Sequence, residues 1–390
     1  MATDTSSYEA LNPATLRRRG TTKWNRYDAD VLALWVAEMD FPTAPVVLAA
    51  VREAVDREQF GYARPEAMTK LSEATAAWSL ARYGWELDPG RVHALPDVLK
   101  GIELAVNFFS PAGSAIVLPT PAYMPFFEVP KVVERPLVEV PMRNEHGRFG
   151  LDLEAIDDAF GRGAKTLILC NPYNPLGRAF SRDELLELAK VVHRNGARVV
   201  SDEIHGPLAY DARHVPYASV SEDAAAHSIT LVSASKGWNL PGLKCAQLII
   251  TNDADEARWQ TIPALATHGV STIGIDANTA AYNDGGEWLD ETLVYLDGNR
   301  HFLAEMLADL LPDVQYRVPE ATYLAWLDFG KLSLPSEPAE FFLEHARVAV
   351  NPGLAFGSNG TGCIRLNFAT TRAILERAVT AMANAVRTHS

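Results

Sequence analysis

The chain has 390 residues, and its 35 Lys and Arg against 49 Asp and Glu give a formal net charge of −14. With 48% hydrophobic and 22% charged residues, the composition excludes a disordered, collagen-like or disulfide-scaffold protein. The acidic balance argues against a nucleic acid or an anionic membrane as the main partner, because both attract basic surfaces.

The three cysteines, Cys170, Cys245 and Cys363, are odd in number and widely spaced, so they predict neither a disulfide framework nor a zinc site. The histidines show no ligand spacing, so no metal is expected. Residues 1–10 are polar and no apolar run is long enough to span a bilayer, which predicts neither a signal peptide nor a membrane helix. We therefore expect a cytoplasmic protein with a small-molecule substrate.

About the first forty residues are irregular, and helical patterns follow at residues 46–57 and 68–82. From about residue 92, short β-rich runs alternate with helical stretches, such as residues 182–195, which end at Gly196. The β-rich runs cover residues 115–118, 137–140, 166–170, 198–201, 229–232 and 247–250. Nearly continuous apolar strands with helices between them predict a mostly parallel sheet covered on both faces.

The pattern changes beyond residue 285. A long helix at 287–310 precedes β-like runs at 322–327, 347–350 and 363–368, and a helix at 372–387 ends the chain. We predict a large α/β domain over residues 46–285, and a smaller α+β domain built from residues 1–45 together with residues 286–390.

Polar side chains follow four of the predicted strands. They are Tyr123, Asn174, the pair Asp202 and His205, and the group Ser233, Ser235 and Lys236. Ligands of open α/β sheets bind beyond the carboxyl ends of the strands, so these side chains are expected to share one site. An aromatic ring, an amide, an acid and a lysine suit an aromatic, phosphorylated cofactor that carries an aldehyde.

These motifs resemble the pyridoxal-phosphate (PLP) enzymes of the aspartate-aminotransferase fold, known as fold type I. The resemblance rests on Asn-Pro-Tyr-Asn-Pro-Leu-Gly at 171–177, Ser-Asp-Glu-Ile-His at 201–205, Ser-Ala-Ser-Lys at 233–236 and Arg365 in Ile-Arg-Leu-Asn-Phe. Lys23-Trp24, Ala37-Glu38-Met39-Asp40-Phe41-Pro42 and Phe60-Gly61-Tyr62 are similar to the cystathionine β-lyase branch, the bacterial carbon–sulfur lyases. The resemblance implies a seven-stranded, mostly parallel sheet in the large domain, and a homodimer with shared sites.

By this resemblance, Lys236 bonds to the cofactor aldehyde, Asp202 pairs with the pyridine nitrogen, and Asn174 and His205 contact the phenolic oxygen, while Tyr123 lies over the ring. Lys236, Asp202 and Tyr123 are the predicted catalytic residues. Each residue also has an ordinary structural interpretation: a surface lysine, a helix-capping acid, a turn asparagine, a structural histidine or a core aromatic ring.

The phosphate and the substrate need further contacts. The phosphate residues implied by the resemblance are Ser233, Ser235, Lys244, the amides of Val98 and Leu99, and Tyr62 of the neighbouring subunit. Lys244 stands where aminotransferases have an arginine, and a lysine offers a point charge in place of a bidentate fork. Arg365 is expected to bind the substrate α-carboxylate.

The expected activity is a carbon–sulfur β-elimination from L-cystathionine or related cysteine conjugates, which releases a thiol, pyruvate and ammonia. An aminotransferase is the alternative with the same cofactor site, and the sequence separates the two poorly. A regulatory protein that binds a transcription factor is an alternative of another class.

Overall fold

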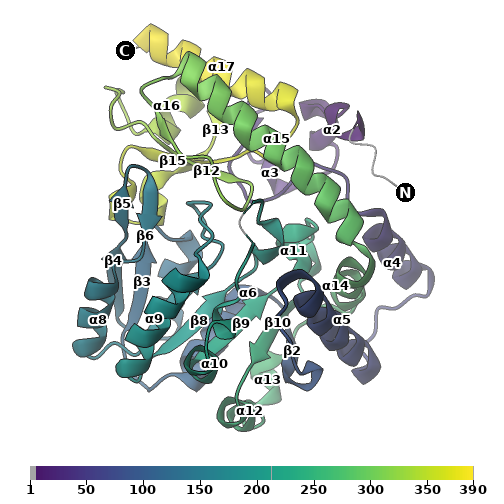
Figure 1. The fold of residues 1–390 in the computed structure, drawn as a ribbon. Helices are drawn as coiled ribbons and strands as arrows, with labels where there is room; N and C mark the ends of the chain where they lie inside the picture. The colour runs from purple at the N-terminus through teal and green to yellow at the C-terminus, as the bar shows by residue number, and fades with distance from the viewer. Residues whose placement is uncertain (1–5, 212, 390) are drawn as a thin grey trace.

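The structure, a computed structural model, describes residues 6–211 and 213–389. Residues 1–5, 212 and 390 lie outside the described residues. The expected polar N-terminus and both predicted domains are therefore described only in part. In Figure 1 a large sheet flanked by helices lies below a smaller sheet, and the long helix α15 (Gly286–Leu310) passes beside both.

The large sheet has seven strands in the order β2-β10-β9-β8-β7-β3-β4. The strands are β2 (Val92–Leu95), β3 (Ile116–Thr120), β4 (Leu137–Pro141), β7 (Thr166–Cys170), β8 (Arg198–Asp202), β9 (Ser228–Val232) and β10 (Ala246–Ile250). β10 is antiparallel to both of its neighbours, and the other pairings are parallel. The mostly parallel, seven-stranded sheet is therefore confirmed.

β2 is the strand that the apolar runs of the sequence do not reveal. It is four residues long, and only its end residues are fully buried. His93 in its middle contacts the Glu256 carboxylate at 2.9 Å, so a polar pair occupies part of this edge strand. A short strand with a polar centre lacks the continuous apolar signal of the buried strands.

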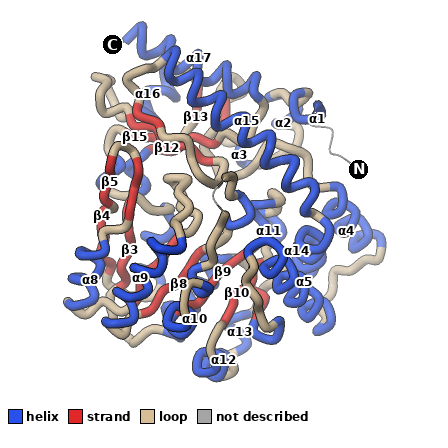
Figure 2. The backbone as a smooth tube through the Cα atoms, in the orientation of Figure 1, coloured by secondary structure: helices blue, strands red, loops and turns tan. Residues whose placement is uncertain are grey.

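Helices cover the large sheet on both sides, as the blue and red tube of Figure 2 shows. They are α4 (Pro45–Asp56), α5 (Pro65–Tyr83), α6 (Val98–Phe109), α7 (Val129–Val132), α8 (Leu153–Gly161), α9 (Arg182–Arg194), α10 (Glu222–His227), α11 (Ala234–Gly237), α12 (Asp253–Trp259), α13 (Ala264–Thr267) and α14 (Thr272–Asp284). Ser181 and Glu184 form a capping box at the start of α9, and Gly196 follows its end with φ of +53°.

The small sheet has four strands in the order β11-β12-β15-β14. They are β11 (Gln315–Tyr316), β12 (Leu324–Asp328), β14 (Asn351–Pro352) and β15 (Cys363–Asn367), with α16 (Pro338–His345) and α17 (Arg372–His389) packed nearby. The hairpin of β5 (Arg143–Glu145) and β6 (Arg148–Gly150) lies beside it.

The β-like run predicted at residues 347–350 is confirmed as one short strand, and a second strand begins at Asn351. β13 (Val348–Ala349) pairs with β1 (Leu32–Ala33), whereas β14 pairs with β15 in the small sheet. The two short strands therefore belong to different sheets.

The N-terminal region contains α1 (Ser6–Glu9), α2 (Pro13–Arg17) and α3 (Thr22–Asn25) before β1. The pairing of β1 with β13 joins it to the C-terminal part of the chain. The boundaries of the two domains at residues 45 and 285 stay a prediction. No helix in the described residues is long and apolar enough to cross a membrane.

Candidate active site

Parallel strands bring the predicted residues to one edge of the large sheet. Asp202 ends β8, with Cys170 of β7 on one side and Leu231 of β9 on the other. The segments that carry Asn174 and Lys236 follow those two neighbours directly. The carboxyl ends of parallel strands meet at the same edge, so chain order alone places these side chains close together.

Lys236 is half-buried in α11, and its Nζ donates to the Ala37 backbone oxygen at 2.7 Å. Burial, and to a lesser extent the Arg365 charge, lowers the pKa of Lys236 from 10.5 to about 8, against the opposing effects of Asp202 and Glu38. A lysine with a pKa near 8 has a substantial neutral amine fraction at physiological pH, which is the form that attacks an aldehyde.

Asp202 is 4% exposed, and its Oδ1 accepts a hydrogen bond from the Ile204 amide at 3.1 Å. Burial raises the pKa of Asp202 to about 7, against the opposing effects of that amide and of Lys236. The carboxyl therefore lacks a cation strong enough to keep it fully ionised. A protonated ring nitrogen of a bound cofactor would supply that cation.

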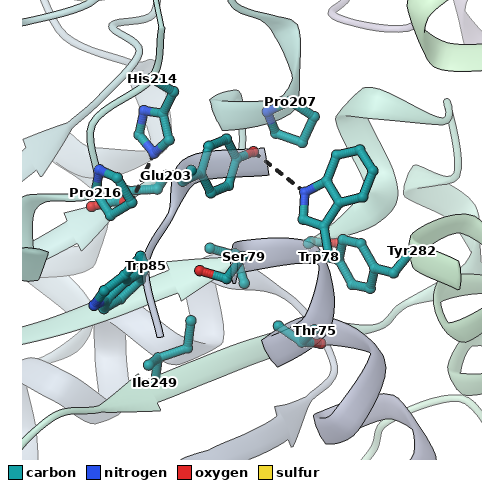
Figure 3. A pocket seen from close by; sticks show the side chains of 13 residues that line it. Thr75, Trp78, Ser79, Trp85, Glu203, Pro207, His214, Pro216, Ile249 and Tyr282 are labelled. Carbon is teal, nitrogen blue, oxygen red and sulfur yellow. Dashed lines mark hydrogen bonds and ion pairs between the residues drawn. The ribbon is translucent and has the colours of Figure 1, made fainter. Parts of the chain in front are cut away.

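The neighbouring acid, Glu203, has a different environment. Its Oε2 contacts His214 Nε2 at 2.9 Å, and its Oε1 accepts from the Ser201 hydroxyl and the Tyr217 amide, both at 2.8 Å. Figure 3 shows this buried pair at a cavity of about 20 Å³, room for one water molecule, which Trp78 and Ser79 also line. Since the Glu203 carboxylate is already satisfied, Asp202 is the acid available to a ligand.

Arg365 of β15 joins the site from the small sheet and is 2% exposed. Its Nη1 donates to Asn174 Oδ1 at 3.0 Å, and its Nη2 donates to the Trp35 oxygen and to Asn351 Oδ1. Its buried Nε has no hydrogen-bond partner among the described residues. Burial lowers the pKa of Arg365 to about 10, so the guanidinium stays charged at neutral pH.

Asn174 accepts through Oδ1, which leaves its NH₂ group as the donor toward a ligand. His205 is 2% exposed, and its Nδ1 has no partner within the described chain. Burial, with the charges of Lys236 and Arg365, lowers the pKa of His205 well below its ordinary value, so the ring is neutral. Both side chains thus present unused polar groups at the site.

Tyr123 is half-buried and packs edge-on against Phe126, with ring centroids 5.5 Å apart. Burial raises its pKa, and the charges of Arg365 and Asp202 also act on its hydroxyl. This electrostatic influence places the ring of Tyr123 near both residues.

The predicted phosphate residues gather at the start of α6. Val98 and Leu99 open this helix, where backbone N–H groups favour an anion, and Asp97 caps it by accepting from the Lys100 amide at 2.8 Å. Lys244 reaches the same end and pairs with Asp97 Oδ2 at 2.8 Å.

The two predicted serines differ. The Ser233 hydroxyl donates to the Cys245 oxygen at 2.7 Å and accepts from the Ser235 amide at 3.0 Å. Its proton is therefore already engaged, whereas the half-buried Ser235 hydroxyl has no recorded partner in the described chain. Of the two, Ser235 is the better placed to donate to a phosphate.

Tyr62 lies apart from these residues, on the loop between α4 and α5, with 94% of its surface exposed. None of the residues that the structure describes covers this ring. Its predicted contact with the phosphate requires a second subunit.

The sequence prediction missed the backbone of residues 34–40, which we call the strap. Its Ala37 oxygen accepts from Lys236 and from the Tyr323 hydroxyl at 3.0 Å, and its Trp35 oxygen accepts from Arg365. The motif at residues 37–42 signalled that this segment matters, but its role depends on backbone carbonyls, which carry no sequence signature.

The residues present fit PLP. Asp202 lacks a full counter-charge, His205 Nδ1 and Arg365 Nε are buried without partners, and a lysine with a lowered pKa lies within electrostatic range of Asp202 and Arg365. Asp202 matches a pyridine nitrogen and His205 a phenolic oxygen. Arg365 matches an amino-acid carboxylate, and the lysine matches an aldehyde. No group of three or more His, Cys, Asp or Glu side chains in the described chain is arranged to hold a metal.

Comparisons with known proteins agree with this geometry. The family model for aminotransferases of class I and II matches residues 29–382. A cystathionine β-lyase of Corynebacterium glutamicum is 42% identical, over 95% of this chain and 97% of that protein.

Two solved structures extend the likeness to the fold. A Corynebacterium diphtheriae structure is 43% identical with a TM-score of 0.94, covering 97% of this chain and 99% of that chain. The PLP-bound C–S lyase of Staphylococcus hominis is 29% identical with a TM-score of 0.90, covering 97% and 98% of the two chains. This chain belongs to the aminotransferase class I and II family, with the fold type I architecture.

Proposed function

We propose that this protein is a PLP-dependent carbon–sulfur β-lyase that cleaves L-cystathionine or related cysteine S-conjugates. The observation that carries the proposal is the amine of Lys236, with a pKa of about 8, within electrostatic range of Asp202 and Arg365. The 42% identity to a cystathionine β-lyase over 95% of the chain favours elimination over amino transfer.

The roles of the residues follow from their environments. Lys236 would hold the cofactor aldehyde, Asp202 its ring nitrogen, and Asn174 and His205 its phenolic oxygen, with Tyr123 against the ring. Bound PLP supplies an electron sink for the carbanion at the substrate Cα. The helix α6 amides of Val98 and Leu99, with Ser235 and Lys244, would bind the phosphate, and Ser233 would keep that loop in place.

Arg365 would bind the substrate α-carboxylate through its unpaired Nε, which fixes the orientation of Cα. Once the substrate amine has replaced it on the aldehyde carbon, the Nζ of Lys236 would be a free neutral amine, able to remove the Cα proton. The C–S bond breaks, its electron pair leaves with the thiolate, and the remaining three-carbon enamine takes up water to give pyruvate and ammonia. The Ala37 oxygen, which also accepts from the Tyr323 hydroxyl, would position this amine.

We also infer a homodimer of the cytoplasm. The apolar side chains of Phe60, Tyr62 and Leu265 are 68%, 94% and 87% exposed, which suits a surface covered by a second copy. All three cysteines are buried and unpaired, as expected in a reducing compartment. Mixing Tyr62→Ala and Lys236→Met subunits should restore part of the activity, because hybrid dimers contain one intact shared site. No recovery on mixing would contradict sharing.

The test of the activity is incubation of PLP-loaded protein with L-cystathionine. We expect thiol and pyruvate to appear in equal amounts, with no accumulation of pyridoxamine phosphate. A ketoacid of the intact substrate, formed without thiol, would identify an aminotransferase instead.

A further inference from the structure

A cleft of about 490 Å³ lies beside the strap, close to the candidate active site. Glu38, Met39 and Asn239 line it; Asn239 follows Lys236 by three residues, and Glu38 follows the carbonyl that Lys236 contacts. The volume is within the range of small-molecule sites, roughly 300–1,000 Å³. Glu38, which lines the cleft, is thus the residue next to Ala37, whose oxygen contacts the reactive amine.

The backbone of the strap is fixed from the protein interior. The Glu38 oxygen accepts from Lys23 Nζ and from Asn367 Nδ2, both at 2.8 Å. Met39 exchanges two hydrogen bonds of 2.9 Å with the Asn239 side chain. With its backbone held in this way, Glu38 presents its side chain at a fixed place in the cleft wall.

The Glu38 carboxylate has no hydrogen bond or ion pair recorded in the described part of the chain, although the side chain is half-buried. Its negative charge acts on Lys236, whose pKa it raises, so the two groups are near each other. An uncompensated carboxylate in a half-buried wall favours a cationic ligand group.

Arg19 lines the same cleft and carries the opposite charge. Its Nη1 donates to the Asp40 oxygen at 2.5 Å and to the Phe41 oxygen at 3.4 Å. Its Nε and Nη2 have no recorded partner among the described residues and are available to an anion. The cleft therefore offers one free carboxylate and one free pair of guanidinium donors.

We propose that this cleft is a subsite for the zwitterionic distal end of the substrate, with Glu38 binding its ammonium group and Arg19 its carboxylate. The inference rests on the proposed lyase function and names the two residues that would recognise an amino-acid group on the leaving thiol. L-Cystathionine has this form, since its leaving group is an amino acid.

The other occupant to consider is a second copy of the chain, because apolar side chains such as Leu48 and Val51 also line the cleft. A subunit interface would be expected to neutralise Glu38 and Arg19 by partner charges. The substrate is favoured because Glu38 and Arg19 line the same cleft with opposite charges, and Glu38 is near enough to Lys236 to act on its pKa.

The experiment compares PLP-loaded wild type, Glu38→Gln and Arg19→Met on matched thioethers. L-Cystathionine has both distal charges, S-(3-aminopropyl)-L-cysteine only the ammonium, S-(3-carboxypropyl)-L-cysteine only the carboxylate, and S-propyl-L-cysteine neither. The readout is kcat/KM for each charged substrate divided by kcat/KM for the propyl compound. This ratio cancels any effect of Glu38 on the pKa of Lys236, because that effect is common to all four substrates.

We expect Glu38→Gln to lower the ratio about tenfold for cystathionine and for the aminopropyl compound, but not for the carboxypropyl compound. Arg19→Met should lower it about tenfold for cystathionine and the carboxypropyl compound only. Glu38→Asp and Arg19→Lys keep the charges and should recover part of the loss.

Ratios that stay unchanged in both variants would overturn the subsite while leaving the lyase function intact. Unchanged ratios together with a weakened dimer, measured by sedimentation, would assign the cleft to the subunit interface and equally overturn it. Failure of the proposed function is distinguishable, since PLP-loaded wild type would then release no thiol from any of the four compounds.

Discussion

Lys23 and Lys236 donate to adjacent carbonyls of the same strap, yet their surroundings differ. Lys23 Nζ contacts the Glu38 oxygen at 2.8 Å and also pairs with the Asp40 carboxylate at 2.9 Å, with both side chains almost fully buried. Lys236 contacts the Ala37 oxygen at 2.7 Å and has no carboxylate within ion-pair distance in the described chain.

The difference shows how a neighbouring acid separates a structural lysine from a reactive one. Asp40 also accepts from the Trp24 indole at 2.7 Å, so the two sequence motifs of the N-terminal region meet in one buried ion pair. Lys236, without such a partner, has a pKa lowered to about 8. Four predictions test this comparison.

The largest effect is expected for Lys236→Met, which removes the amine that binds the cofactor and moves the Cα proton. Turnover should fall by about 10⁴-fold, the upper end for general acid–base catalysis. The variant should also lack an absorption band that borohydride reduction bleaches in wild type. Residual activity within tenfold of wild type would show that another group performs the proton transfer.

Lys23→Met should instead act on stability, because it leaves the Asp40 carboxylate buried and unpaired. The free energy of unfolding should fall by about 3–5 kcal/mol, measured by denaturant titration. Arg57→Met is the control, since it breaks an exposed ion pair with Glu53 and should cost about 1 kcal/mol or less. Equal losses in the two variants would contradict a structural role for the Lys23–Asp40 pair.

The two lysines can also be compared through the pH dependence of stability in the cofactor-free protein. The pKa of Lys236 is about 8 when folded against 10.5 as its ordinary value, so between these pH values the unfolded chain binds more protons. Wild-type stability should therefore rise with pH across this window, while the penalty of the buried charge is fully present below pH 8.

At pH 7, cofactor-free Lys236→Met should accordingly be more stable than wild type by roughly 3 kcal/mol. This difference should shrink as the pH rises from 8 toward 10.5. Lys23→Met should show the opposite sign of stability change. A difference for Lys236→Met that does not vary with pH would mean that the lysine is not the titrating group.

The smallest effect is expected for a third lysine, Lys244, whose side chain is 59% exposed and pairs with Asp97. Solvent screens this charge, so Lys244→Met should weaken PLP binding only about threefold to fivefold, measured by fluorescence titration of the cofactor-free protein. A loss of a hundredfold or more would show that Lys244 acts as strongly as a buried cation.

Much of the fold could be predicted from the sequence, because buried strands produce a strong local pattern of apolar residues. The run at 166–170 coincides with β7, and the strands that end at Asp202 and Val232 were placed within a residue. β2 was missed because a short edge strand with His93 at its centre lacks that pattern. The run at 347–350 contained β13, but its pairing with β1 of the N-terminal region was not predicted, because pairing partners carry no local residue pattern.

The sequence by itself determined the alternating α/β order, and with it the edge of the sheet where Asn174, Asp202 and Lys236 meet, because strand ends and turn residues are local signals. Only the tertiary structure decided the contacts of Arg365 with Asn174, of Lys23 with Asp40, and of Lys236 with the strap. These contacts join residues far apart in the chain, and several end on backbone carbonyls that every residue type carries. Their chemistry therefore depends on which atoms packing brings together and withdraws from water.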